Sequence, residues 1–213
     1  GFFTFSYNPI RGPGGSVDGI FCACYETTAK VVGARRLETL RRLGEQRVDT
    51  GSVSEACAKA LAVLRENPHD VPFAHVHLVD EEGRLAGDPG TPQVIAPDAL
   101  DAMLETHTPQ EVGGLELPGA VWPEPVTQAV ALPLLSAAQD KPAGVIVLGI
   151  SPRRPLDVEY RTFLSLIAGQ VSTTLANARA REEDRGAAES TARHNAIVEF
   201  SDDAIISKDL DGI

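Results

Sequence analysis

The first residues of the chain alternate between aromatic and polar side chains. Phe2–Tyr7 has this alternation, and Val17–Tyr25 is apolar and rich in residues that favour strands. The segment between them, residues 8–16, is dense in Gly and Pro, which favour turns. The sequence therefore predicts an antiparallel hairpin with a rather long loop.

A helix over about residues 29–47 follows, with Thr27 or Thr28 as its N-cap. Its apolar positions become regular in the second half, where three leucines are spaced by three residues and arginines flank them. So narrow an apolar stripe is typical of a helix that pairs with another helix. These leucines are Leu37, Leu40 and Leu43.

A second helix is predicted up to about Glu66, capped by Ser52 or Ser54 and ended by Asn67-Pro68. The remaining pattern predicts strands separated by a region rich in Pro and Gly. The expected elements are a strand over 73–80, a short helix over 97–106, a strand over 127–134 and a strand over 144–150. Residues 144–150 are almost continuously apolar, which is typical of a central strand buried on both faces.

The last predicted element is a long helix that begins after Asp157 and continues past Glu183. Beyond residue 179 it becomes highly charged, and Gly186 marks an interval before helical sequence resumes up to Phe200. A short strand over 204–207 is expected after it. The apolar face of the long helix consists of Phe163, Ile167, Val171, Leu175 and Ala178.

The charge of the chain limits its partners. The 213 residues carry a formal net charge of −11, and an acidic surface disfavours both nucleic acid and anionic membrane surfaces. No apolar stretch has the roughly 20 residues that cross a bilayer, so we expect no membrane insertion. Three cysteines do not make a disulfide framework, which indicates a reducing, cytoplasmic location.

Two segments carry a family resemblance. They are 72–83 (PFAHVHLVDEEG) and 141–150 (KPAGVIVLGI), the latter followed by residues 155–171 at the start of the long helix. Together they resemble the GAF domains of bacterial multi-sensor histidine kinases. Residues 5–28 are similar to the C-terminal strands of PAS domains, and residues 197–213 are similar to the N-terminal part of PAS domains. We therefore expect a partial domain at each end of the chain.

The resemblance implies an α+β fold. It consists of a GAF-like central antiparallel sheet with helices packed on one face, long N- and C-terminal connecting helices and partial PAS-like strands at both ends. The implied domains are a PAS-like hairpin over 1–28, a connecting helix over 29–48, a GAF-like domain over 49–185, and a linker helix with the start of a second PAS-like domain over 186–213.

The resemblance also implies a function. A PAS–GAF–PAS order is typical of the sensory arm of a sensor histidine kinase, which signals to a response regulator. We expect a homodimer whose seams use the two apolar helix faces named above, Leu37, Leu40 and Leu43, and Phe163, Ile167, Val171, Leu175 and Ala178. Packing of these side chains within one chain is the alternative. Signals would pass by small shifts of paired helices.

Few residues indicate chemistry. His75 and His77 share one face of a predicted strand and are candidates to line a ligand pocket, more so than to bind a metal. Cys57 lies on the apolar face of a helix, whereas light-sensing GAF proteins attach bilin through cysteines in later strands or loops. We therefore expect neither bilin nor another cofactor. His194 lacks the sequence context of a phospho-accepting histidine.

Three hypotheses follow for function. The first is a sensory and dimerising module with an unidentified small-molecule ligand. The second is a ligand-free spacer whose cavity is filled by its own side chains. The third, ranked last, is a small redox enzyme like the GAF proteins that reduce methionine sulfoxide, which need several cysteines where this region has Cys57 alone. The sequence predicts no catalytic residue.

Overall fold

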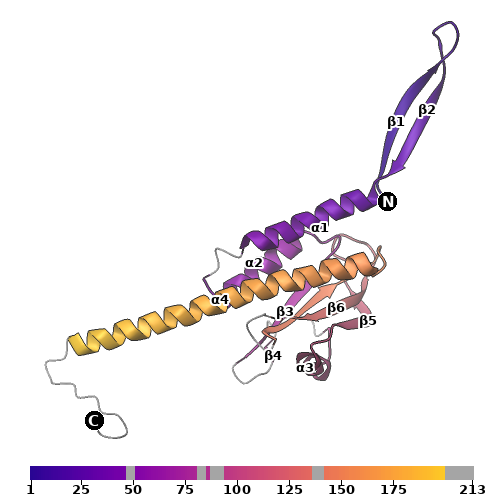
Figure 1. The fold of residues 1–213 in the computed structure, drawn as a ribbon. Coiled ribbons are helices and arrows are strands. Elements are labelled where there is room, and N and C mark those ends of the chain that lie inside the picture. Colours follow the sequence, from indigo (N-terminus) through magenta and orange to yellow (C-terminus); the bar gives the residue numbers. More distant parts are fainter. Residues whose placement is uncertain (47–50, 81–84, 87–93, 136–141, 200–213) are drawn as a thin grey trace.

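A computed structural model describes residues 1–46, 51–80, 85–86, 94–135 and 142–199 (Figure 1). The chain begins with the predicted hairpin, formed by β1 (Phe3–Arg11) and β2 (Val17–Glu26). Its strands are antiparallel, with Phe5 opposite Cys24 and Tyr7 opposite Cys22. The hairpin projects away from the rest of the molecule, and most of its residues are exposed.

Two helices follow, α1 (Thr28–Glu45) and α2 (Val53–Arg65). The N-cap of α1 is Thr27. Of the two serines considered for α2, Ser52 is the cap, because its side chain accepts a hydrogen bond from the N–H of Glu55. Such a bond satisfies one of the backbone donors that a helix start leaves unpaired.

The central sheet has five antiparallel strands in the order β4-β3-β7-β6-β5. Their bounds are β3 (Ala74–Val79), β4 (Leu85–Ala86), β5 (Gln110–Leu117), β6 (Val126–Pro133) and β7 (Gly144–Gly149). The prediction for the apolar run is confirmed, because β7 lies in the middle of the sheet and all of its residues are buried.

Close packing around β7 explains its two terminal glycines. A Cβ atom on Gly144 would lie 2.2 Å from the carbonyl oxygen of His77, and one on Gly149 would lie 2.6 Å from the ring of Phe73. Only a residue without a side chain allows such an approach. The glycines thus let β3 and the chain before it close against the central strand.

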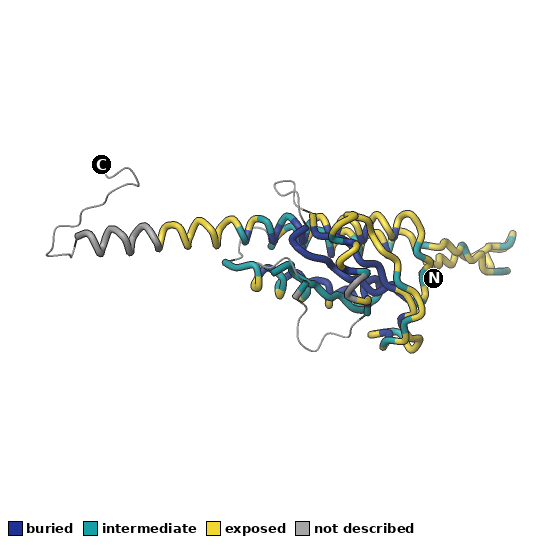
Figure 2. The backbone as a smooth tube through the Cα atoms, turned by 90° about the horizontal axis from the view of Figure 1, so that it is seen from below, coloured by how far each residue is buried: buried dark blue, intermediate teal, exposed yellow. Residues whose placement is uncertain are grey.

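The expected α+β architecture with a central antiparallel sheet is present. Helices α1, α2 and α4 (Val158–Glu199) cover one face of the sheet and enclose the larger core with the inward side chains of β6 and β7. Figure 2 shows this buried layer in dark blue. The other face is covered by α3 (Pro97–Thr106), where Leu100 and Met103 pack on Val145 and Val147.

Three details differ from the sequence predictions. Helix α4 is continuous from residue 158 to 199, with no break at Gly186, because one glycine lowers helix stability without ending the helix. Helix α1 is part of the helical layer, since Val32 and Leu43 are buried. Strand β5 was not predicted; its Gly113-Gly114 pair and its acidic residues obscure the strand pattern.

The C-terminal part of α4 leaves the domain. Residues 181–189 are all exposed, and the helix extends well past the sheet in Figure 2. Residues 197–199 belong to this helix. The predicted strand over 204–207 and the rest of the PAS-like opening lie outside the described residues. No helix in the described part of the chain is long and apolar enough to cross a membrane.

Candidate functional site

The predicted seam residues lie mainly inside one chain. Six of the eight have side chains buried in the core that the helical layer shares with the sheet: Leu43, Phe163, Ile167, Val171, Leu175 and Ala178. Leu40 is partly buried against the same core, and Leu37 is 67% exposed. The structure therefore places these six in intramolecular packing, the alternative, and of the predicted residues it leaves Leu37 and part of Leu40 for a seam between two copies.

Helices α1 and α4 run side by side in the same direction, with Arg36 beside Tyr160 and Phe163 near one end and Gly44 beside Gln170 near the other (Figure 1). A Cβ atom on Gly44 would lie 3.9 Å from Oε1 of Gln170. Two adjacent stripes at helical spacing therefore form an outer surface, which we call the α1–α4 face. Its exposed members are Gly33 and Leu37 of α1 and Leu166 of α4, and the half-buried residues Leu40, Gly44 and Thr173 border them.

The two histidines point to the side of the sheet that α3 covers. Ala74, Val76 and Leu78 of β3 pack on the larger core, so the alternating positions His75 and His77 lie on the opposite face. They pair with Val147 and Val145, whose side chains contact the smaller core. Partial burial lowers the pKa of the His77 imidazole, which favours its neutral form.

The cysteines occupy two different environments. Cys22 and Cys24 are exposed on the hairpin, whereas Cys57 packs against the larger core from α2. Burial raises the pKa of the Cys57 thiol to about 11. Within the described part of the chain no three His, Cys, Asp or Glu side chains gather as metal ligands do.

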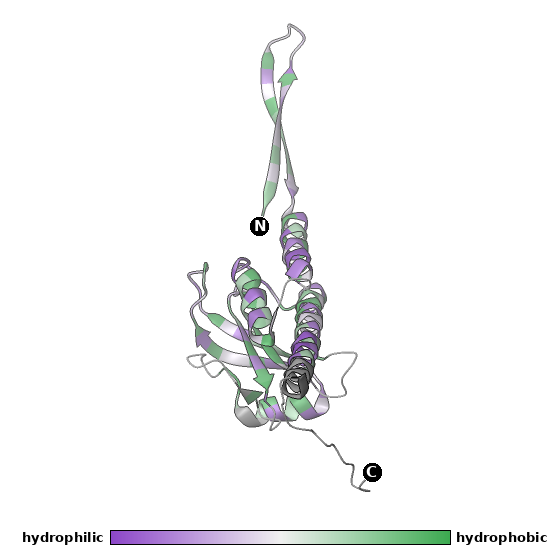
Figure 3. Cartoon of the chain, turned by 90° about the vertical axis from the view of Figure 1, so that its left-hand side faces the viewer, coloured by the Kyte–Doolittle hydropathy of each residue, from purple (hydrophilic) through white to green (hydrophobic). Residues whose placement is uncertain are grey.

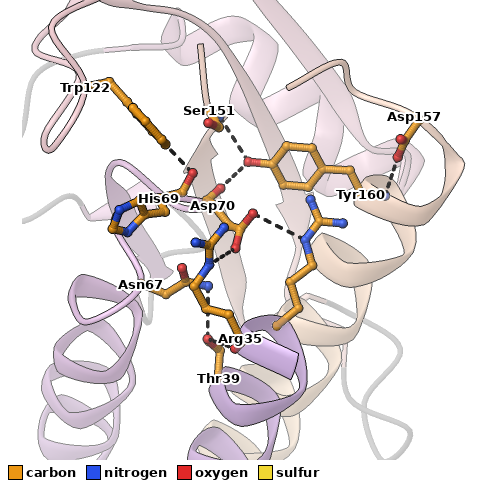
Figure 4. Close-up of polar contacts among 10 residues, drawn as sticks. Arg35, Thr39, Asn67, His69, Asp70, Trp122, Ser151, Asp157 and Tyr160 are labelled. Atoms are coloured by element: carbon orange, nitrogen blue, oxygen red, sulfur yellow. Dashed lines mark hydrogen bonds and ion pairs between the residues drawn. The ribbon is translucent and has the colours of Figure 1, made fainter. Parts of the chain in front are cut away.

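A buried polar cluster was not anticipated from the sequence (Figure 4). Asp70, in the connection between α2 and β3, has a fully buried carboxylate. Nε of Arg35 lies 2.7 Å from its Oδ2 and Nε of Arg36 lies 3.4 Å from its Oδ1. Both arginines come from α1, so a single carboxylate faces two cations on the same helix.

Tyr160 joins the cluster from the first turns of α4. Its hydroxyl donates to the carbonyl oxygen of Asp70 and accepts from the N–H of Ser151 at 3.0 Å. The guanidinium of Arg36 lies over the Tyr160 ring, 4.2 Å from its centroid. Burial raises the pKa of the Tyr160 hydroxyl to about 12, so this group stays a donor at neutral pH.

The surroundings of this cluster are polar as well. Nδ2 of Asn67 donates to Thr39 of α1 at 3.1 Å inside the protein, and the indole of Trp122 donates to the carbonyl of His69. Asp157 caps α4 by accepting from the N–H of Tyr160 at 2.8 Å. Contacts at residues 67, 69 and 70 thus tie the α2–β3 connection to three other segments.

A cleft of about 520 Å³ opens beside Arg36, where the base of the hairpin meets α1 and the start of α4. Charged groups of both signs line it: Glu26, Arg36, Arg154, Asp157 and Glu159, together with Thr28, Ala29, Val32 and Gly33. This cleft was not predicted, because its residues come from three segments that lie far apart in the sequence. The arginine pair in α1 and Asp70 before β3 can be read in the sequence, but no spacing rule joins them.

The sheet order and the helical layer define an α+β domain, and comparison with solved structures identifies its fold. The GAF domain of the potassium sensor histidine kinase KdpD from Escherichia coli is similar to this chain with a TM-score of 0.50 and 18% identity, over 68% of this chain and 96% of that domain. This chain has the GAF fold.

Two phytochromes are similar over more of the chain. The photosensory core module from Stigmatella aurantiaca has a TM-score of 0.52 and 16% identity, and the bacteriophytochrome RpBphP3 from R. palustris has 0.50 and 14%. Each covers 92% of this chain, which spans 46% and 47% of theirs. No protein-family model matches the sequence, and no curated protein matches it.

Proposed function

We propose that this chain is a sensory and dimerising module of a larger signalling protein, and that the larger protein is a sensor histidine kinase acting on a response regulator in the cytoplasm. The observation that carries the proposal is the arrangement of α1 and α4. The two helices lie parallel on one face of a GAF fold, and α4 continues beyond the domain with exposed residues. Such helices are suited to passing on a change in helix packing.

The hairpin supports PAS-like neighbours. Cross-strand partners share a face, so Phe3, Phe5, Tyr7, Pro9, Ile20, Cys22 and Cys24 form one largely apolar side. Figure 3 shows hydrophobic (green) positions in both strands of the hairpin. A two-stranded hairpin is at best marginally stable in water by itself. We propose that this side packs within a PAS-like sheet, in agreement with the sequence resemblance of residues 5–28.

A second copy of this chain is the proposed occupant of the α1–α4 face. Leu37 is 67% exposed and Leu166 is 50% exposed, and both lie on this face. The face continues directly into the part of α4 that leaves the domain, so pairing there would bring the two extended helices together. Gly33 leaves open space above its Cα atom, which allows a partner helix to approach closely.

Disulfide trapping tests this pairing. In a background of Cys22→Ser, Cys24→Ser and Cys57→Ala, cysteines replace Leu37 or Leu166, and Val121→Cys serves as control because Val121 is a 49% exposed apolar residue of the β5–β6 connection. Mild oxidation should link the first two variants into dimers, singly or when mixed, at least tenfold faster than the control. Equal rates in all three would contradict the proposed interface.

The ligand-free spacer is the second candidate, and one observation favours it. The face of the sheet next to His75 and His77 is filled by the chain itself, since Met103, Ala131 and Val147 are almost fully buried there. A thermal-shift screen of small metabolites separates the two candidates, because a ligand raises stability by mass action. The sensory reading expects a hit that His77→Ala abolishes.

An enzymatic role has less support. The raised pKa of Cys57 leaves almost no thiolate at neutral pH, and the thiolate is the form that attacks a substrate or a bilin. Cys22 and Cys24 lie on the hairpin, away from the sheet face that the histidines occupy. We therefore propose that this module acts by conformational change without a covalent cofactor.

A further inference from the structure

Asp70 is the point at which α1 and α4 meet the same residue. Its carboxylate is contacted by Arg35 and Arg36 of α1, and its carbonyl oxygen accepts the hydroxyl of Tyr160 of α4. We call Arg35, Arg36, Asp70 and Tyr160 the Asp70 cluster. Asp70 itself belongs to neither helix, so a movement of one helix reaches the other through the α2–β3 connection.

The contacts of the cluster are directional, unlike the apolar contacts around them. Val32 and Leu43 hold α1 on the core by burial, which tolerates a small rotation or slide of the helix. The bond from Arg35 to Asp70 does not, because a charge-assisted hydrogen bond depends on a distance near 2.7 Å and on its angle. The cluster therefore fixes the rotation of α1 about its axis, whereas apolar burial holds α1 against the core.

Burial of Asp70 restricts the rotation of α1 further. The Asp70 carboxylate has no exposed surface, so only the two guanidinium groups and nearby polar atoms can replace its lost hydration. Arg36 in turn is held by Asp70 on one side and by the rings of Tyr160 and Phe163, at 4.2 and 5.2 Å, on the other. Arg36 thus joins α1 to α4 directly as well as through Asp70.

We propose that the Asp70 cluster is a latch that fixes α1 against α4, and that opening it frees α1 while the sheet and α4 stay folded. Its significance for signalling rests on the proposed function, in which α1 and α4 are the connecting helices. The latch itself is a property of one chain and needs no dimer. The released state would be the second packing that a two-state relay requires.

Hydrogen exchange on the full chain tests the latch. In Asp70→Asn, amides of α1 should exchange at least tenfold faster than in the wild type, whereas amides of β7 should change less than twofold. Arg42→Gln is the matched control, since Arg42 also joins α1 to the end of α2, but through an exposed pair with Glu66. Unchanged α1 exchange in Asp70→Asn, or equal acceleration in β7, would overturn the proposal.

Coupling between the helices gives a second test that does not depend on Asp70→Asn folding. Arg35→Gln removes the contact from the α1 side and Tyr160→Phe removes the hydroxyl from the α4 side. We expect their effects on α1 exchange to be non-additive by at least threefold, because both act through Asp70. Strict additivity would show that the two helices do not communicate through it.

The same samples separate this inference from the proposed function. Light scattering gives their oligomeric state, which the latch does not predict. A monomeric wild type with accelerated, non-additive α1 exchange in the variants would contradict the dimer and support the latch. A dimeric wild type whose α1 exchange is indifferent to Asp70, Arg35 and Tyr160 would support the dimer and contradict the latch.

Discussion

At the scale of single residues, the environments of the three cysteines make a direct check on the fold. Cys22 and Cys24 are exposed, and Cys57 packs against the core with a thiol pKa raised to about 11 by burial. At pH 8 a thiol reagent should modify two cysteines rapidly and the third at least a hundredfold more slowly, until denaturant exposes it. Three fast cysteines in the native protein would be inconsistent with the placement of α2.

Tyr160 should make the free energy of unfolding fall at alkaline pH. Burial raises its hydroxyl pKa from 10.0 to about 12, so its contribution is complete below pH 10 and is lost as the pH rises toward 12. A shift of this size corresponds to on the order of 2–3 kcal/mol. Urea denaturation of the wild type and Tyr160→Phe should therefore give free energies that converge between pH 10 and 12.

Other groups affect the free energy of unfolding of the two proteins equally at alkaline pH, so their effects cancel in the comparison. Cys57 is present in both, and Tyr7 and Tyr25 are exposed in both. Curves that stay parallel from pH 8 to 12 would mean that the Tyr160 hydroxyl is not buried against Asp70.

At the scale of elements, the start of α2 depends on a single side chain. Ser52 accepts from the N–H of Glu55 at 3.1 Å, whereas Ser54 is exposed inside the first turn. Ser52→Ala should lower the free energy of unfolding by about 1 kcal/mol, and Ser54→Ala should change it by less than about 0.5 kcal/mol. Chemical denaturation measures both, and equal effects would rule out Ser52 as the cap.

The central strand gives a contrast between two glycines. Gly144→Ala would place a methyl group 2.2 Å from the carbonyl oxygen of His77, so we expect a loss of about 3 kcal/mol. Gly169→Ala on exposed α4 meets nothing within 4 Å and should raise stability by up to about 1 kcal/mol. Thermal unfolding of both variants checks the pair; a tolerated Gly144→Ala would mean that β7 does not lie against β3 in this register.

The sequence predicted best those elements that are specified by residues close together in the chain. The helix over 97–106 and the strand at 144–150 were predicted nearly to the residue, because a proline at the helix start and an unbroken apolar run are local. Strand β5 was missed because Leu115 and Val112 are spaced by a bulge near Gly114, whose φ is 73°. A bulge removes the alternation on which strand prediction depends.

The candidate site was harder to predict than the fold. Leu43, Phe163 and Ile167 have helical periodicity, but periodicity does not say whether an apolar stripe faces its own sheet or another chain. The Asp70 cluster is even harder to predict from the sequence, since its carboxylate pairs with arginines 34 and 35 residues earlier in the chain. Contacts across such separations are set by the packing of whole helices.

At the scale of the whole molecule, a GAF fold lies between two projecting elements, the hairpin and the part of α4 that leaves the domain. The hairpin leads directly into α1, and the other projection is the continuation of α4. These two helices are joined through Asp70. A change in helix pairing at the α1–α4 face would therefore act on both projections. Such coupling requires that a second copy of the chain covers the α1–α4 face.

The molar mass of the 213-residue chain in solution is the most direct test of that claim. One chain has a mass of 22.6 kDa. Multi-angle light scattering should give about twice this value. Replacing both Leu37 and Leu166 by Glu should return the mass of one chain without loss of helical content, and Val121→Glu should leave the dimer intact. A wild-type mass of one chain across the micromolar range would contradict the proposed dimer.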